Sequence, residues 1–108
     1  MGKYLLHGSY SIEGNQGIVK GGGGTARRKA ITTLVESVGG KLESAYWALG
    51  KDDFYIIVDL PNNVAVAAVA LQVGGSGAIS RLSSTPLLTA EDVDAATKVG
   101  VKYTPPGQ

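Results

Sequence analysis

The 108-residue chain contains no cysteine and a single histidine, His7. The absence of cysteine excludes disulfides, thiolate metal ligands and a thiol nucleophile. A structural zinc site needs about four protein ligands, which one histidine without cysteine does not supply. We therefore expect neither a bound metal nor a cofactor.

Long apolar runs and a strong excess of one charge are also missing. No apolar stretch approaches the roughly 18 residues of a membrane span, and the first residues lack the apolar segment of a signal peptide. Lysine and arginine total 10, aspartate and glutamate total 9, and the net charge is +1. Phosphate-backbone binding needs a clear basic excess. We expect a cytoplasmic protein that binds neither membranes nor nucleic acid.

The length fits a single domain, residues 1–108, with a tail at 101–108. Alternating apolar residues predict strands over 3–10, 41–48, 53–60 and 78–88, and helical spacing predicts helices over 25–38, 64–73 and 89–98. A further helical turn is expected around 17–20. We expect Thr25 and Thr89 to cap the helices that follow them. Residues 64–73 are apolar nearly all round, which predicts burial on more than one side.

The predicted elements follow the order βαββαβ and end with an extra helix. This order is typical of the α+β, ferredoxin-like fold, in which two helices cover one face of a four-stranded antiparallel sheet. The hairpin 41–60 shows apolar side chains on both faces, since Tyr55 and Ile57 lie opposite the face of Phe54 and Ile56. An uncovered apolar sheet face is uncommon on a monomer. We therefore predict a homodimer, or a higher oligomer, packed sheet to sheet as a closed α+β barrel.

Several stretches together resemble the GYD domain family of the dimeric α+β barrel superfamily. They are Lys3–Leu6 with Tyr10, Gly22–Arg28, Leu34–Lys41, Tyr46, Gly50–Asp53, Leu60-Pro61, Arg81 and Thr85–Thr89. Where the family usually has Gly-Tyr-Asp, this chain has Asp52 in the tyrosine position and keeps Asp53. The resemblance implies the dimeric barrel fold. Relatives in the superfamily include cofactor-free monooxygenases, haem-handling enzymes and small-molecule-responsive proteins, so it leaves the activity open.

A glycine-rich loop, Gly21–Gly24, leads into the first long helix. Glycines let backbone N–H groups approach an anion at a helix N-terminus, which makes Gly22, Gly23, Gly24 and Thr25 candidates for an anion site. Cations at Arg27 and Arg28 oppose the helix dipole there, so an anionic ligand or carboxylates from elsewhere in the assembly are expected nearby. The alternative is a flexible loop followed by a solvated helix face.

His7 is a candidate general base or haem ligand in a cavity that the sheet forms with the helices or with a partner, and the alternative is a hydrogen-bonded core or interface histidine. Arg81 is expected to bind a carboxylate, either on a ligand or, preferably, on a second subunit. Asp53 is expected to cap or bridge the hairpin turn. The full set of ligand-binding candidates is His7, Tyr10, Arg27, Arg28, Tyr46, Tyr55 and Arg81.

Three functions remain open from the sequence. The preferred one is a small oligomeric domain without demonstrable catalysis that binds a small molecule between sheet and helices. The second is a cofactor-independent oxygenase or isomerase that uses His7 with a tyrosine or Arg81. The third is a structural module whose glycine-rich loop and tail join dimers into a larger assembly.

Overall fold

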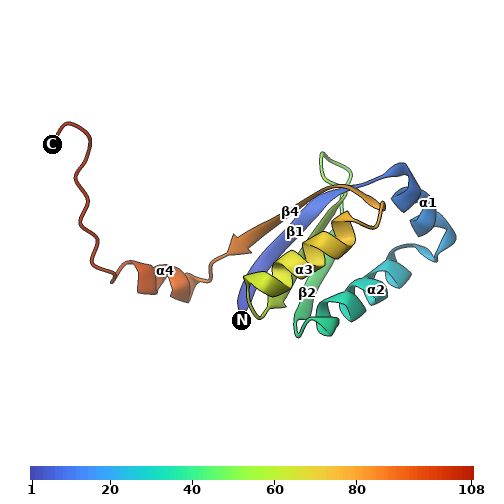
Figure 1. Cartoon of the computed structure of the whole chain (residues 1–108), viewed down its shortest axis with the longest axis horizontal. Coiled ribbons are helices and arrows are strands. Elements are labelled where there is room, and N and C mark those ends of the chain that lie inside the picture. Colours follow the sequence, from blue (N-terminus) through green and yellow to red (C-terminus); the bar gives the residue numbers. More distant parts are fainter.

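Strands and helices follow one another in nearly the predicted order (Figure 1). The computed structural model describes residues 1–108. The elements are β1 (Gly2–Tyr10), α1 (Ile12–Lys20), α2 (Gly23–Ser37), β2 (Lys41–Trp47), β3 (Phe54–Leu60), α3 (Asn63–Gly74), β4 (Ile79–Leu87) and α4 (Ala90–Ala96). All predicted strands and helices are confirmed, and α1 is a complete helix where a single helical turn was expected.

The four strands form one antiparallel sheet in the order β2-β3-β1-β4. β1 and β3 occupy the centre, and β2 and β4 are the edges. Helices α2 and α3 cover one face of this sheet (Figure 1). The α+β, ferredoxin-like fold predicted from the order of elements is therefore confirmed.

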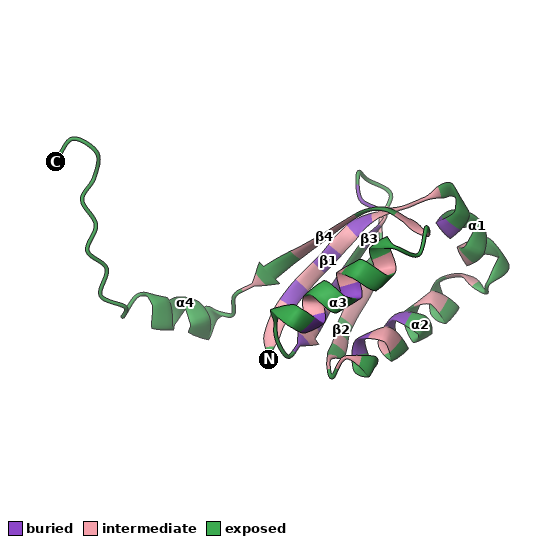
Figure 2. Ribbon diagram, in the orientation of Figure 1, coloured by how far each residue is buried: buried purple, intermediate pink, exposed green.

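The core lies between the sheet and helices α2 and α3 (Figure 2). Its ten buried residues are Tyr4, Leu6, Ile31, Val35, Phe54, Ile56, Val58, Leu60, Ala65 and Val69. In the central strands β1 and β3 they occupy alternate positions, as the pleat of a sheet with one covered face requires. Full burial of one such large apolar side chain stabilises the fold by about 1.5–3 kcal/mol.

The helix caps follow local side-chain chemistry with one exception. The side chains of Asn62 and Thr89 accept hydrogen bonds from Ala65 N and Asp92 N, so the predicted cap at Thr89 is confirmed. The predicted cap at Thr25 is wrong, because α2 already begins at Gly23. Its N-cap is Gly22 at φ 100°, a left-handed conformation that lets α1 and α2 follow each other closely.

Helix α3 is buried on one side only. Ala65 and Val69 face the core, whereas Val64 and Leu71 are 78% and 75% exposed. The prediction that this helix is buried on more than one side is therefore wrong for the single chain. None of the helices combines the length and the hydropathy of a membrane span.

The chain leaves the folded body after β4. Residues 88–108, here called the C-terminal arm, contain α4 and project away from the sheet (Figure 1). Every residue of the arm is exposed, as the uniform colour in Figure 2 shows. The arm therefore contributes nothing to the core of its own chain.

Candidate functional sites on the two faces of the sheet

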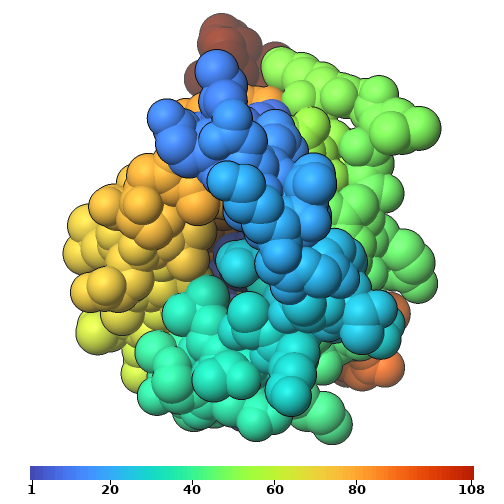
Figure 3. Space-filling model, turned by 90° about the vertical axis from the view of Figure 1, so that its right-hand side faces the viewer, coloured from blue at the N-terminus to red at the C-terminus, as the bar shows by residue number.

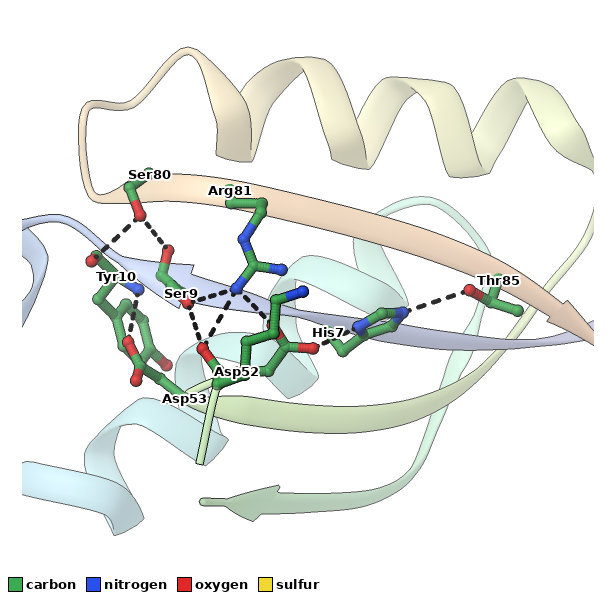
Figure 4. A network of polar contacts seen from close by, with 9 residues as sticks. His7, Ser9, Tyr10, Asp52, Asp53, Ser80, Arg81 and Thr85 are labelled. Carbon is green, nitrogen blue, oxygen red and sulfur yellow. Dashed lines mark hydrogen bonds and ion pairs between the residues drawn. The ribbon is translucent and has the colours of Figure 1, made fainter. Parts of the chain in front are cut away.

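Two groups of chemically interesting side chains lie on opposite faces of the sheet. The first, here called the hairpin cluster, consists of His7, Ser9, Asp52, Arg81 and Thr85 on the face without helices (Figure 4). The second lines a hollow among α1, α2 and the sheet, here called the helix-side hollow.

The β2–β3 turn brings Asp52 and Asp53 against the end of β1. The backbone N–H of Asp53 donates to Gly8 O at 2.7 Å, and its carboxylate Oδ2 accepts from the Tyr10 N–H at 3.0 Å. The turn is thereby fixed to the neighbouring strand. Asp53 thus bridges the turn, one of the two roles expected from the sequence.

Asp52 is the buried centre of the hairpin cluster, with 7% of its surface exposed. Its Oδ2 lies 2.7 Å from His7 Nδ1, and its Oδ1 lies 2.5 Å from Arg81 Nη2. The hydrogen bond to His7, and then the contact with Arg81, lower the pKa of the Asp52 carboxyl below its ordinary value of 3.8, although burial acts in the opposite direction. Asp52 is therefore held as a carboxylate.

The other groups of the cluster are also partnered. His7 Nε2 lies 3.3 Å from Thr85 Oγ1, and the His7 ring stacks on Tyr55 with centroids 5.9 Å apart and planes at 8°. The Arg81 guanidinium also donates to Ser9 Oγ at 3.0 Å and to Lys51 O at 3.2 Å. Figure 4 shows the five side chains of the hairpin cluster pointing toward one another from β1, β4 and the turn.

Chemically, a carboxylate on Nδ1 of a histidine orients the ring as in many general bases. However, none of the five hollows in the surface borders His7, Asp52 or Arg81. Within one chain, the groups of this cluster are bonded to one another and face no enclosed space for a substrate.

Asp52 and Thr85 are members of this site that were not predicted from the sequence. The partner of Arg81 was expected on a ligand or a second subunit, whereas the structure gives it Asp52 of the same chain. The sequence contained one signal that could have pointed to Asp52, because this chain has a carboxylate where the family usually has a tyrosine. Thr85 shows no such signal, because only the register of β4 on β1 brings it to His7.

The helix-side hollow is visible as an opening in Figure 3. It comprises two adjoining spaces, an outer and an inner part, which share Tyr10 and Arg27 in their walls. The outer part, about 320 Å³, opens between α1 and α2 and is bordered by backbone at Gly14, Gly17, Gly21 and Gly23. The inner part, about 40 Å³, reaches toward the sheet and is lined by apolar core side chains. Only the outer part has the several hundred Å³ typical of a ligand site.

Arg27 lies where the two parts meet, since it lines both. It is the one charged residue of the inner part, and its Nε atom is buried without any hydrogen-bond acceptor. Leaving a buried charged donor unpaired costs about 1–3 kcal/mol or more. Glu13 is the one carboxylate on the wall of the outer part, and it makes no ion pair with Arg27.

Tyr10 also lines both parts of the hollow. Its hydroxyl accepts a hydrogen bond of 3.0 Å from Trp47 Nε1, and its ring packs on Phe54 with centroids 5.1 Å apart. Trp47 is the only tryptophan of the chain. A change in the hollow that moves Tyr10 therefore also changes the surroundings of a single fluorophore.

The sequence-predicted site residues thus separate into three places. His7, Tyr55 and Arg81 meet in the hairpin cluster, Tyr10, Arg27 and Gly23 line the helix-side hollow, and Arg28 and Tyr46 line a groove between α2 and β2. Gly22 precedes α2 as its N-cap, Gly24 lies near the Trp47 ring, and Thr25 is exposed in the first turn.

The sequence model of the GYD domain matches residues 4–97, which include both candidate sites. No curated protein and no solved structure matches the chain.

Proposed function

The chain belongs to the GYD domain family, and we propose that it is a homodimeric domain that binds a small organic carboxylate in the helix-side hollow. The observation that supports this most is Arg27, whose buried Nε has no acceptor at the junction of a roomy outer part and an apolar inner part. A carboxylate would supply the missing acceptor by a charge-assisted hydrogen bond.

The shape of the hollow limits the ligand class. The inner part of about 40 Å³ admits only a short apolar group, whereas the outer part of about 320 Å³ accepts the bulk of a small molecule. Glycines at the outer wall let a ligand approach the backbone, since they carry no Cβ. A carboxylate with a short alkyl or aryl tail is a ligand class that fits the size of both parts.

The test uses hexanoate and benzoate as probes and the fluorescence of Trp47 as the readout. We expect saturable binding by the parent chain and a loss of at least about tenfold in affinity for Arg27→Met, because a hydrogen bond to a charged group contributes about 1.5–3 kcal/mol. Arg28→Met is the matched control, since Arg28 is the next residue of α2 but lines a different groove. Equal affinities of the two variants would contradict the proposal.

The homodimer is supported by the open face of the sheet. Tyr55 and Tyr46 are 39% and 70% exposed there, and Leu5 and Ile57 are only half-buried on that same face. A second sheet packed on this face would remove those apolar groups from water. Sedimentation should give the mass of two chains, and Ile57→Asp should shift it toward one. A parent chain that sediments as a monomer would rule out this part of the proposal.

A second candidate function is acid–base catalysis by His7. It is favoured by the hydrogen bonds that join the two ring nitrogens of His7 to Asp52 and Thr85. A partner sheet over the hairpin cluster would enclose it and exclude water, which catalysis of this type needs. If the protein turns over a substrate, His7→Gln should abolish the rate, while the affinity of hexanoate stays unchanged. Turnover that survives His7→Gln would eliminate this candidate.

A further inference from the structure

The C-terminal arm has apolar side chains that its own chain does not cover. Those that are largely exposed are Leu88 (72%), Val93 (49%), Val99 (65%), Val101 (76%) and Tyr103 (69%). Helix α4 has only seven residues, and isolated helices of that length are marginal in water even with the capping box at Thr89. The arm therefore needs a surface that the body of its own chain does not provide.

The last part of the arm has the pattern of a strand. Val99, Val101 and Tyr103 alternate with Gly100, Lys102 and Thr104, which is the period of a half-buried strand. These residues nevertheless belong to no strand of the sheet. A segment with this pattern can add to a free sheet edge by backbone hydrogen bonds.

The edge strand β2 offers such a place. It pairs only with β3, and a groove of about 440 Å³ runs between β2 and α2. Arg28 and Lys41 line this groove together with Glu36 and Glu43, and Tyr46 and Leu42 add apolar surface. Lys29 follows Arg28 in α2, so the end of the groove near the start of α2 is basic.

The acidic helix of the arm and the basic end of this groove are complementary in charge. Helix α4 contains Glu91, Asp92 and Asp94 and no cation. Since β4 and β2 are opposite edges of the sheet, the arm that continues β4 leads away from the β2 groove of its own chain. A second copy is therefore the occupant that the topology allows.

We propose that the C-terminal arm of one copy docks in the β2–α2 groove of a second copy. Residues 99–104 add to the free edge of β2, and the carboxylates of α4 lie near Arg28 and Lys29. This interaction extends the homodimer of the proposed function and requires no ligand. It also accounts for cations in the first turns of α2, where they oppose the helix dipole.

The first test measures self-association of full-length variants by sedimentation. Val101→Asp should weaken dimerisation at least about tenfold, because it places a charge among the apolar groups of the docked arm. Val19→Asp is the matched control, since Val19 is 83% exposed on α1 and lies outside the groove. A dimer that resists Val101→Asp but dissociates with Ile57→Asp would overturn the arm docking and leave the sheet-to-sheet dimer intact.

The second test uses the absence of native cysteine. Each single-cysteine variant is full-length, and Val101→Cys is mixed with Ser44→Cys on β2 or, as a control, with Gln16→Cys on α1. Docking predicts that a disulfide between different variants forms faster with Ser44→Cys than with Gln16→Cys. Equal rates in the two mixtures would overturn the inference whatever the oligomeric state.

Discussion

The two faces of the sheet differ in whether their charged side chains have partners. In the hairpin cluster, Asp52 has two cationic or hydrogen-bonding partners, and Arg81 has three groups to bond. In the helix-side hollow, the buried Nε of Arg27 has none. The Oδ1 atom of Asp52 makes no hydrogen bond of its own but is neutralised by the ion pair with Arg81. An ion-paired network stabilises one conformation, whereas an unpartnered donor beside empty space is available to a ligand. The comparison suggests a structural role for the first face and a binding role for the second.

The largest expected effect comes from Gly8 of β1, which lies close against the backbone of β4. A Cβ at this position would lie 1.9 Å from the backbone oxygen of Arg81. Gly8→Ala should therefore separate the strands that hold Arg81 near Asp52, and should lower the free energy of unfolding by about 3 kcal/mol or more. Urea unfolding measures this effect.

Gly17→Ala is the control for Gly8→Ala. Nothing lies within 4 Å of a Cβ at Gly17, which is inside α1. This substitution should leave the stability unchanged or raise it by about 0.5–1 kcal/mol, because alanine favours a helix over glycine. Equal destabilisation by both substitutions would contradict the close approach of β1 and β4.

The next effect concerns the hollow. Val69 is 3% exposed and lines the inner part, so Val69→Ala should cost about 2 kcal/mol of unfolding free energy and enlarge that part. Octanoate should then gain affinity relative to hexanoate. Val64→Ala on the exposed side of α3 should change stability by less than about 0.5 kcal/mol. An unchanged preference between the two probes would show that the inner part does not receive the ligand tail.

A smaller effect is expected at acid pH from Asp52. Its pKa is lowered in the folded state, chiefly by the hydrogen bond to His7, so the unfolded chain binds the proton more readily. The stabilisation is present above the ordinary value of 3.8 and is lost as the pH falls through the lower folded pKa. Asp52→Asn should flatten the dependence of the urea midpoint on pH in this range, and Asp94→Asn in the arm should not. An unchanged slope for Asp52→Asn would contradict the carboxylate network.

The smallest effect is expected at alkaline pH from Lys3, which lies on the same face as the hairpin cluster. Its Nζ contacts Glu43 and Asp59 at 2.7 and 3.1 Å, and the hydrogen bonds to these two carboxylates raise its pKa above 10.5. This stabilisation is present below 10.5 and is lost as the pH rises through the folded pKa. Lys3→Met should remove a shallow alkaline decline in thermal midpoint, since partly exposed ion pairs contribute little. If the alkaline decline in thermal midpoint persists in Lys3→Met, a group other than Lys3 causes it.

Local patterns in the sequence predicted the elements because they depend on near neighbours. The alternation from Phe54 to Leu60 predicted β3, and Thr89 predicted the start of α4. The prediction for Thr25 failed because glycines upstream extended α2 by two residues. The prediction for α3 failed because its composition does not show how many sides the rest of the chain covers.

Of the candidate sites, the sequence supplied His7, Arg27 and Arg81 as chemically capable residues but not their partners. Asp52 is 45 residues from His7 along the chain, and only the folded turn over β1 brings them to 2.7 Å. Arg27 Nε has no acceptor, whereas Arg81 has a carboxylate partner. In both cases the packing of distant parts of the chain decides which groups lie beside the guanidinium.

The sequence by itself determined the βαββαβ order and the family, because the type of each element follows from the periodicity of apolar residues. It also excluded thiol chemistry, because the chain contains no cysteine. The tertiary structure alone decided that the glycine-rich loop borders a hollow, that Asp52 replaces an external partner for Arg81, and that the C-terminal arm is left uncovered. These features depend on contacts between residues far apart in the chain, for which local sequence patterns contain no signal.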